Sequence, residues 1–544
     1  MILQEDVIPW QLAAPESAAS TLRAAPRSPW EGGTHRNKPL AKCYPLVSFQ
    51  KHSNALDFAG CHGQTEMDQF RQDRIKQLQL LRSRGIDPYP SGPFAKDPIS
   101  EVLLRQVGEP CRVAGRIMLY RLMGKLTFAH LQDESGRMQI MLTQKALGDD
   151  YKFWAAQLEM GDIVGCEGVR YDTNKGERSV LVEKVTLLSK ALRPLPDKWK
   201  GLQDDEKRFR QRYLDILFNP EVKDMIYKKD RFWNSVRAFL KNRGFVEVQT
   251  PVLETTPGGG DARPFLTHHN ALDLDVKLRI SMGELWQKRL MVAGLEKTFE
   301  IGRQFRNEGM DAEHLQDYDQ MEFYWAYANY EWGMELVHDL FLYIAQETFG
   351  TYRFQIGDFA IDLEEPWKRY DYAETILEHT GVNVFEASFD QMVDRLRCLG
   401  VAFDKKGFHR ARAIDSLWKH CRKQISGPGF LVNEPVEVSP LAKRNGRDGR
   451  LVERFHVLLA GSELGNGYSE LNDPIDQAER FSIQQQLREG GDEEAQQSDD
   501  EFVEALEYGM PPTVGFGMSE RVFAFLMNKS MRECQLFPLM RPLN

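Results

Sequence analysis

Five short stretches of β-type sequence, spaced by turn residues, constrain the fold of this chain more than any other feature. A helical segment, DDYKFWAAQLEMG, stands between the third and the fourth stretch. Five strands with one helix at this place are what an OB-fold barrel requires, although periodicity alone would also allow another small β-barrel. The five stretches lie between Cys111 and Leu188 and read RVAGRIM, KLTFAHLQDESG, RMQIML, DIVGCEGVR and RSVLVEKV.

The rest of the chain divides around this barrel. A length of 544 residues favours two or three folded units. Residues 1–66 are rich in Ala, Pro, Ser and Gly, so we expect a disordered extension; a mis-assigned translation start and a targeting or interaction tail would both account for it. Residues 67–192 then hold a charged N-terminal helix and the barrel, 193–220 form a charged linker, and 221–544 form a large α/β region. The first strong helix of that region is predicted at 225–243.

Composition and charge limit the class of protein. Hydrophobic residues make up 42% of the chain, enough for sizeable cores. The net charge of −10 would repel phosphates, so any contact with nucleic acid needs local basic patches. The seven cysteines form no C-x-x-C pair, which disfavours a disulfide framework and a zinc knuckle. The sequence has no apolar run of about 18 residues and no secretory signal, so we expect a cytoplasmic protein without a membrane span.

The segment 305–327, FRNEGMDAEHLQDYDQMEFYWAY, contains an alternating stretch after Gln316. A strand with this pattern would bury one parity in a core and present the other to a cavity. The parity predicted to be buried is Met321, Phe323, Trp325 and Tyr327. The parity predicted to face a cavity is Gln320, Glu322 and Tyr324.

Charged residues precede this stretch in a glycine-containing turn. Arg306 offers a guanidinium to phosphate oxygens, and Tyr318 offers a ring to a base. His314 and Glu308 lie between them in the chain. The mixture suits a nucleoside triphosphate, and an ion-paired surface hairpin is the other interpretation.

Two further segments carry candidate ligands. GSELGNGYSELNDP, at 461–474, alternates Glu463, Asn466 and Glu470 with glycines that let a ligand approach the backbone. Its carboxylates suit Mg²⁺ or an ammonium group, or a turn-rich acidic loop without a ligand. GFGMSERVFAFL, at 515–526, leads from a glycine-rich strand end into a helix, which alone is weak evidence for a site. The chain has no G-x-x-x-x-G-K-[ST] motif, which disfavours a P-loop ATPase.

Together these segments resemble the class II lysyl-tRNA synthetases over residues 68–544. The family-specific phrases are TPGGGDARPFLTHHNALDLD, FEIGRQFRNEG, PVEVSPLAKR, GNGYSELND and LFPLMRP. The resemblance implies an α+β multidomain protein, with an N-terminal OB-fold barrel and a catalytic domain built on an antiparallel sheet with helices. It implies ATP-dependent activation of L-lysine and its transfer to tRNA-Lys. The segment FVEVQTPVL, with Pro251, further implies a homodimer.

The resemblance also assigns roles to single residues. Arg306 and Arg521 would be catalytic: Arg306 would hold the α-phosphate and the lysine carboxylate, and Arg521 would make a second cationic contact on the other face of the nucleotide. The residues implied for ATP are Arg306, Glu308, His314, Tyr318, Asn466 and Arg521. Those implied for lysine are Gly260, Glu284, Glu322, Tyr324, Asn466 and Glu470. Those implied for Mg²⁺ are Glu463, Glu470 and, as a poorer ligand, His456.

In the barrel, the resemblance implies that Phe128 and Gln132 read the anticodon, with Arg116 supplying a phosphate contact. An unstacked base would lie on the phenyl ring while the amide reads its edge. The other interpretation of Phe128 is an aromatic residue of the barrel core.

Two positions depart from the family pattern. His456 stands where the family carries a second metal-binding glutamate, and imidazole is a poor ligand for Mg²⁺. The loop GFGMSER is one residue shorter than the usual run before the arginine, which would place Arg521 differently. Either change could slow the enzyme.

Three other functions remain open. An aspartyl- or asparaginyl-type synthetase shares the barrel and the motifs, but its pocket would need basic residues where Glu284 and Glu470 stand. A relative that lysylates a protein usually lacks the anticodon barrel. A non-enzymatic tRNA-binding or scaffold protein would not need to keep Arg306 and Arg521.

Overall fold

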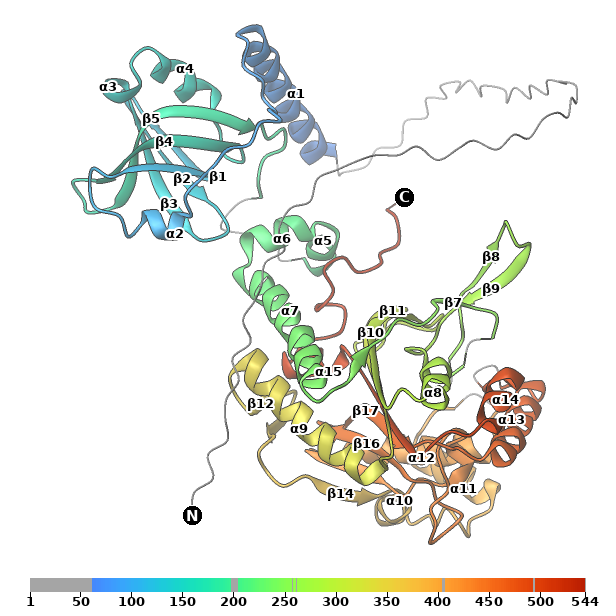
Figure 1. The fold of residues 1–544 in the computed structure, drawn as a ribbon. Coiled ribbons are helices and arrows are strands. Elements are labelled where there is room, and N and C mark those ends of the chain that lie inside the picture. The colour runs from blue at the N-terminus through green and yellow to red at the C-terminus, as the bar shows by residue number, and fades with distance from the viewer. Residues whose placement is uncertain are drawn as a thin grey trace, which may run out of the picture. The chain divides into compact units, whose positions relative to one another are not determined.

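The computed structural model describes residues 61–196, 204–256, 258–260, 262–403, 407–492 and 495–543. The chain divides into two compact units, Met1–Pro194 and Leu195–Asn544 (Figure 1). Residues 1–60 of the extension predicted at residues 1–66 lie outside the described residues. Helix α1 (Cys61–Ser83) begins before Met67, so the N-terminal helix starts earlier than predicted. No proline interrupts the stretch between Cys61 and Met67, and the helix therefore continues through it.

The first unit contains a closed barrel with the strand order β1–β2–β3–β5–β4, which confirms the predicted OB-fold barrel. β3 and β5 are parallel, and the other neighbouring pairs are antiparallel. The helices α3 (Gln144–Leu147) and α4 (Asp150–Gln157) stand between β3 and β4, where a helix was predicted. The remaining elements are α2 (Ile99–Val102), β1 (Pro110–Met123), β2 (Leu126–Gln132), β3 (Arg137–Thr143), β4 (Ile163–Asp172) and β5 (Arg178–Ser189).

The second unit is built on a sheet with the order β14–β15–β16–β17–β18–β11–β10–β6. Its pairs are antiparallel except for β14–β15 and β10–β6, which agrees with the predicted antiparallel catalytic domain. Segments far apart in the sequence therefore lie side by side: β11 pairs with β18. The strands are β6 (Val246–Glu247), β10 (Lys297–Phe305), β11 (Asp317–Ala326), β14 (Lys368–Asp371), β15 (Gly429–Val432), β16 (Arg454–Leu459), β17 (Ser462–Ser469) and β18 (Thr513–Ser519).

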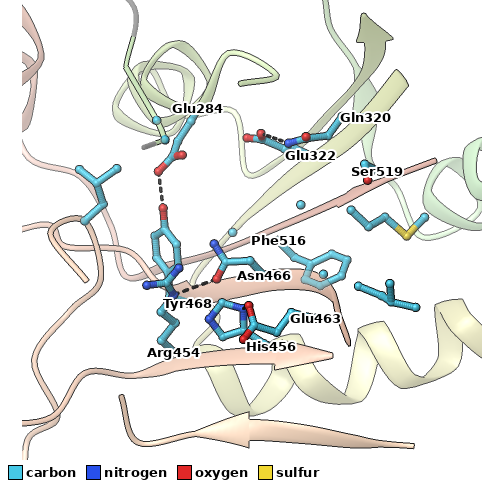
Figure 2. Close-up of a pocket in the computed structure, with 18 of the residues that line it drawn as sticks. Glu284, Gln320, Glu322, Arg454, His456, Glu463, Asn466, Tyr468, Phe516 and Ser519 are labelled. Carbon is cyan, nitrogen blue, oxygen red and sulfur yellow. Dashed lines mark hydrogen bonds and ion pairs between the residues drawn. The ribbon is translucent and has the colours of Figure 1, made fainter. Parts of the chain in front are cut away.

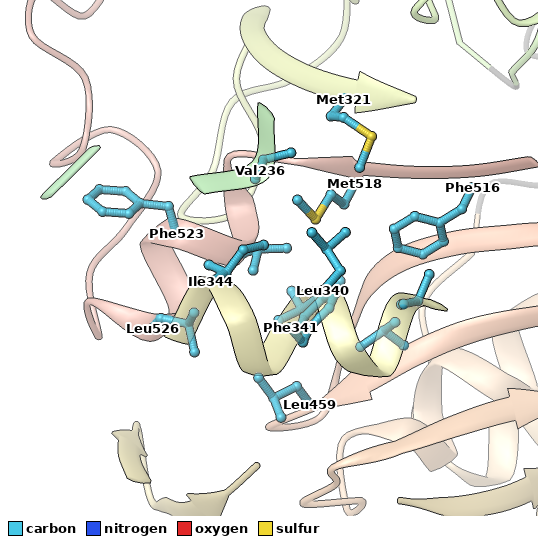
Figure 3. Packing of buried hydrophobic residues seen from close by; sticks show 14 of the residues in the cluster. Val236, Met321, Leu340, Phe341, Ile344, Leu459, Phe516, Met518, Phe523 and Leu526 are labelled. Atoms are coloured by element: carbon cyan, nitrogen blue, oxygen red, sulfur yellow. The ribbon is translucent and has the colours of Figure 1, made fainter. Parts of the chain in front are cut away.

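One face of this sheet is covered by α7 (Pro220–Lys241), α9 (Tyr330–Phe349) and α15 (Arg521–Leu526). Figure 3 shows Leu340 of α9 and Met518 of β18 in the apolar core between these helices and the sheet. Each fully buried side chain of this size stabilises the fold by about 1.5–3 kcal/mol. We call this core the helix-side core. It fixes the strands of the sheet in place, and with them the side chains on the opposite face of the sheet.

Helices also pack on the opposite side. α8 (Glu284–Val292), α13 (Pro474–Glu489) and α14 (Asp500–Glu507) surround a smaller core that includes Tyr324 and Tyr468. Beside β15, a third core forms around the buried Trp418. Its helices are α10 (Tyr372–Thr380), α11 (Phe389–Cys398) and α12 (Arg410–Arg422). The remaining elements are β7 (Leu253–Glu254), β8 (Leu266–His269), β9 (Leu274–Leu278), β12 (Arg353–Ile356), β13 (Phe359–Asp362) and the 3-10 turn η1 (Val436–Val438).

The predicted linker, 193–220, is wrong in its second half. Residues there form α5 (Asp205–Arg210) and α6 (Arg212–Phe218), and α7 begins at Pro220 instead of residue 225. The charges that suggested a solvated linker are paired: the buried carboxylate of Asp215 accepts bonds from Arg208 at 2.9 Å and from Arg212 at 2.6 Å. Within the part of the chain that the structure describes, no helix is long and apolar enough to cross a membrane.

Candidate active site

A cavity of about 370 Å³ hollows the face of the sheet opposite the helix-side core. Its floor is a row of register partners on four neighbouring strands. His456 of β16 faces Asn466 of β17, Asn466 faces Gly517 of β18, and Gly517 faces Glu322 of β11 (Figure 2). Because side chains alternate along each strand, the neighbours of His456, Gly517 and Glu322 belong to the helix-side core instead.

The alternation predicted for β11 is confirmed along most of its length. Met321 and Phe323 are fully buried in the helix-side core, whereas Glu322 and Tyr324 line the cavity. The prediction is wrong for Tyr327, whose side chain is 65% exposed. The strand ends at Ala326, and Tyr327 has a positive φ of 60°, so it leaves the period of the strand.

Glycine on β18 is needed to keep the cavity open. A Cβ atom added at Gly515 would lie 2.2 Å from Oε1 of Glu470 and 2.7 Å from the ring of Tyr324. Real Cβ atoms do not approach other atoms that closely, so only glycine leaves room for both side chains. The glycine-rich segment thus shapes the cavity through the space that it leaves.

One end of the cavity, the acidic end, is formed by the carboxylates of Glu284, Glu322 and Glu470, all of them buried. Glu322 accepts bonds from the Tyr324 hydroxyl at 3.0 Å and from the backbone N–H of Met282 at 3.0 Å. Burial, together with the charge of Glu284, raises the pKa of Glu322 to about 7.

The remaining two carboxylates of the acidic end have partners of their own. The Tyr468 hydroxyl donates to Glu284, as Figure 2 shows. Burial raises the pKa of Glu470 to about 8, although the ammonium group of Lys288 opposes the shift. Glu322 and Glu470 are therefore costly to keep charged unless a cation is near.

Lys288, which the sequence analysis did not single out, supplies such a cation. Its side chain is 1% exposed, and its Nζ lies 2.8 Å from Oε1 of Glu284 and 2.7 Å from Oε2 of Glu470. The expectation that these carboxylates wait for an external cation is thus incomplete, because one cation already lies between them. The (i, i+4) spacing of Glu284 and Lys288 on α8 is the sequence signal that could have revealed the pair.

The other end of the cavity, the basic end, is formed by Arg306, His314 and Arg521. The Arg306 guanidinium lies 6.0 Å from the centre of the Tyr318 ring, so a planar group placed there would meet both. His314 is exposed, and its Nδ1 lies 2.9 Å from Oδ1 of Asp311. The geometry offers cations and an aromatic face to an anionic, planar ligand.

Arg521 is less available than the sequence suggested. Its guanidinium donates to the backbone carbonyl of Glu463 and lies 3.7 Å from the carboxylate of Glu313. Glu313 also accepts a bond from the Ser462 hydroxyl at 3.0 Å. Sequence reasoning missed Glu313, which lies next to His314 in the turn before β11. A ligand at the basic end would therefore compete with Glu313 for Arg521.

Glu308 is the one residue predicted for the catalytic domain that does not line the cavity. Its Oε1 accepts a bond from the backbone N–H of Arg263 at 3.1 Å. β10 ends at Phe305, so Glu308 lies in the turn beyond the sheet. The other predicted residues of that domain, including Gly260 and Asn466, line one shared hollow.

The residues predicted for Mg²⁺ do not form one group. His456 Nε2 lies 2.8 Å from Oε1 of the buried Glu434, and its Nδ1 lies 3.7 Å from Oε2 of Glu463. Glu470 lies at the acidic end with Lys288. Among the described residues, no three His, Cys, Asp or Glu side chains are placed to hold a metal ion. An imidazole between two carboxylates fits an ion-paired cluster better than a Mg²⁺ site.

Arg454 and Glu434 are further cavity-side residues that the sequence analysis missed. Arg454 lines the cavity and donates to Asn466 Oδ1 at 2.9 Å (Figure 2). It also lies 2.9 Å from Oε2 of Glu434, which does not line the cavity. Arg454 and His456 together hold the pKa of buried Glu434 down to about 2 despite its burial. The matching parity of Arg454 and His456 on β16 was a usable signal, whereas Glu434 lies after β15 and comes into contact only through the tertiary fold.

In the barrel, the side chains of β2 alternate. Thr127, Ala129 and Leu131 are buried, whereas Phe128 and Gln132 are only partly buried on the opposite parity. Phe128 is therefore on the outer side of the strand and not in the barrel core.

Arg116, the third residue predicted for the barrel, is the register partner of Gln132. It donates to the Gly161 carbonyl at 2.8 Å. Part of its hydrogen-bonding capacity is thus used within the barrel.

Comparison with known proteins agrees with this geometry. Residues 204–541 match the family model of the tRNA synthetases class II (D, K and N), and residues 111–188 match the OB-fold nucleic acid binding domain. The lysine–tRNA ligase of Thermosipho africanus is 41% identical over 491 residues, covering 88% of this chain and 97% of that protein. The lysine–tRNA ligase of Thermoanaerobacter sp. strain X514 is 43% identical over 490 residues, with 88% and 97% covered. That of Roseiflexus sp. strain RS-1 is 42% identical over 487 residues, with 88% and 99% covered.

Proposed function

The chain belongs to the class II tRNA synthetases (D, K and N), and from this membership we propose that it is a lysine–tRNA ligase, which activates L-lysine with ATP and transfers it to tRNA-Lys. The observation that carries the amino-acid assignment is the acidic end of the cavity. Buried carboxylates favour a ligand with an ammonium side chain and disfavour a neutral or acidic one, which would leave them unpaired.

The reaction needs positioning and charge neutralisation more than a protein nucleophile. A carboxylate oxygen of lysine attacks the α-phosphorus of ATP, a C–O–P anhydride bond forms, and pyrophosphate leaves as the bond to the β-phosphate breaks. A ribose hydroxyl of tRNA then attacks the carbonyl, and AMP leaves as the ester forms. Arg306 belongs to the basic end of the same cavity that holds the acidic end, and it is our candidate to neutralise both reacting anions.

We assign the basic end to ATP. Tyr318 is the candidate to stack on adenine, with His314, Asn466 and Arg521 contacting the remainder of the nucleotide. Glu308 lies outside the lining of the cavity, so its contact requires the turn after β10 to move toward the nucleotide.

The acidic end is assigned to lysine. We expect the ε-ammonium group to meet the carboxylates and the hydroxyl of Tyr324, while Gly260 leaves space beside Arg306. Family membership implies Mg²⁺ with the ATP, but Glu463, His456 and Glu470 do not fit a Mg²⁺ site as a set. Because of this poor fit, we assign no step of the reaction to Mg²⁺ bound by these three residues.

The barrel is assigned to the tRNA. Phe128 and Gln132 offer a ring and an amide on the outer side of β2, which suits an unstacked anticodon base, and Arg116 supplies a neighbouring cation. We further propose a homodimer, on the resemblance of the segment around Pro251, and a cytoplasmic location, because charging takes place where the tRNA is.

The test is ATP–pyrophosphate exchange by the full chain with each of the twenty amino acids in turn. We expect exchange with lysine alone, followed by lysine transfer to tRNA-Lys. Exchange with aspartate or asparagine and not with lysine would instead assign the chain to the other members of the D, K and N group. No exchange with any amino acid, together with binding of tRNA, would favour a non-enzymatic tRNA-binding protein.

A further inference from the structure

Lys288 is an unusual residue to find beside a cavity assigned to a cationic ligand: it does not line the cavity, but it contacts two of the carboxylates that do. It lies on α8 with a 1% exposed side chain and contacts carboxylates from two different elements: Glu284 on its own helix and Glu470 just beyond β17. The rings of Tyr468 and Phe502 lie 5.4 Å and 5.8 Å from its Nζ. A buried ammonium group is costly unless it is paired, so these contacts hold it in one place.

The charges of the acidic end can be counted. Three carboxylates, those of Glu284, Glu322 and Glu470, face one resident cation, Lys288. If all four groups are ionised, the net charge is three negative plus one positive, or minus two. A free lysine molecule brings two ammonium groups, and its carboxylate belongs at Arg306 under the proposed function. Two ligand ammonium groups and one resident ammonium group together balance three carboxylates.

We propose that Lys288 is a positioning residue, a resident counter-ion that holds Glu284 and Glu470 apart and sets the charge of the acidic end to match the two ammonium groups of lysine. This inference rests on the proposed function and deepens it. It explains why a pocket for a cation contains a cation of its own: without Lys288, the carboxylates of Glu284 and Glu470 would face each other across the same buried space.

Glu322 does not depend on Lys288 for its position, so the role proposed for Lys288 concerns only Glu284 and Glu470. Glu322 is held by Tyr324, by the Gln320 amide at 2.6 Å and by the backbone of Met282. Among the described residues, the carboxylate of Glu470 is held only by the ammonium group of Lys288, whose Nζ lies 2.7 Å from its Oε2. Loss of Lys288 would therefore free Glu470 to turn away or take up a proton, and leave Glu322 in place.

The first experiment compares Lys288→Met with the full-length wild-type protein in lysine-dependent exchange. We expect the KM for lysine to rise by about tenfold or more, because a buried ion pair loses one partner, with a small change in the KM for ATP. The matched control is Arg289→Met on the same helix, which removes a cation that pairs with Asp499 at 3.0 Å and lies outside the cavity. It should leave the KM for lysine near the wild-type value.

The second experiment tests charge directly. The double variant Lys288→Met/Glu284→Gln removes one cation and one carboxylate, so that the acidic end again carries minus two. We expect its KM for lysine to fall below that of Lys288→Met alone. If Lys288 were only a packing residue, the two substitutions would add their costs and the double variant would bind lysine more weakly than either single variant.

The outcomes separate this inference from the proposed function. If the wild-type protein shows no lysine-dependent exchange, the proposed function fails. If the wild type exchanges and Lys288→Met keeps an unchanged KM for lysine, the inference about Lys288 is overturned while the function stands. If Lys288→Met does not fold, the double variant decides: a folded protein stabilised against heat by lysine supports the counter-ion, and an unfolded or unresponsive one overturns it.

Discussion

Single carboxyl groups decide how this cavity responds to pH. Glu322 is buried, and its pKa is raised to about 7. Desolvation is the larger cause of this shift, and the negative charge of Glu284 adds to it. Because this pKa is raised above that of an unfolded chain, the folded protein holds the proton more tightly. Ionising Glu322 therefore costs stability as the pH rises toward 7, unless a cation is bound. A lysine ammonium group compensates for that cost.

We predict that lysine binds more tightly as the pH rises through about 7, because only ionised Glu322 attracts an ammonium group. The KM for lysine in the exchange assay should fall between mildly acidic and mildly alkaline pH. The comparison variant is Glu322→Gln, which cannot ionise and should bind lysine weakly with a flatter pH dependence. A wild-type KM that is the same on both sides of neutrality would contradict the prediction.

His456 is the second residue at which a single side chain affects the site, here through the ligands that are available to a metal ion. It lies between the carboxylates of Glu434 and Glu463, at 2.8 Å and 3.7 Å, and takes the position at which the resemblance implies a glutamate. An imidazole contributes no anionic oxygen to a hard cation.

We predict that His456→Glu lowers the Mg²⁺ concentration needed for half-maximal exchange, because it adds a carboxylate beside Glu463. The measurement is exchange at a fixed ATP concentration across a Mg²⁺ series. His456→Gln, which removes the imidazole without adding charge, is the control and should not lower the requirement. An identical Mg²⁺ dependence in the wild type and His456→Glu would remove His456 from any role in metal use.

At the scale of elements, the two faces of strand β2 in the barrel have different roles. Its buried side, with Ala129 and Leu131, builds the barrel core, and its outer side presents Phe128 and Gln132. A strand can carry a recognition surface without disturbing the core, because successive side chains point in opposite directions.

We predict that Phe128→Ala weakens aminoacylation of tRNA-Lys by about tenfold, since stacking of one base contributes about 1–3 kcal/mol. Lysine-dependent ATP–pyrophosphate exchange should be unchanged, because every residue lining the cavity lies in the second unit. The control is Leu131→Ala, which damages the core and should lower the thermal unfolding temperature of the protein. An equal loss of exchange and aminoacylation in Phe128→Ala would show that Phe128 supports the fold.

At the scale of the whole molecule, the cavity and the barrel belong to different units of the chain. The cavity draws on residues from Gly259 to Met531 and on none from the first unit. The candidate site for activation therefore lies in one unit, and the proposed function assigns selection of tRNA to the other.

We predict that a chain beginning at Cys61 retains the wild-type kcat and the KM for lysine and ATP in exchange. The described residues that line the cavity lie between Gly259 and Met531. A deletion series that ends before α1 keeps α1, the barrel and the second unit, and it can be compared with the full chain by sedimentation, where we expect a dimer in both cases. A loss of exchange on removal of residues 1–60 would show that this segment acts on the cavity.

The sequence predicted much of this molecule because its signals are local. Alternation in the stretch after Gln316 predicted a strand with two faces, which β11 confirms up to Ala326, and the five stretches from Cys111 to Leu188 predicted the barrel strands. Predictions failed where a local pattern has two physical outcomes. A charged stretch is either a solvated linker or part of a folded unit, and in 205–218 the buried Asp215, which pairs with Arg208 and Arg212, anchors two helices.

What the sequence alone determined is the choice of strands, the family resemblance and most of the residues in the cavity, because period and residue type are properties of neighbouring positions. Tertiary structure decided which charges meet. Lys288 and Glu470 are 182 positions apart, from 288 to 470, yet lie 2.7 Å apart. Glu308 turned away from the cavity, and Glu313 turned toward Arg521. Ion pairing depends on distance in space and on burial, and both are fixed only when the strands of the sheet pair in register.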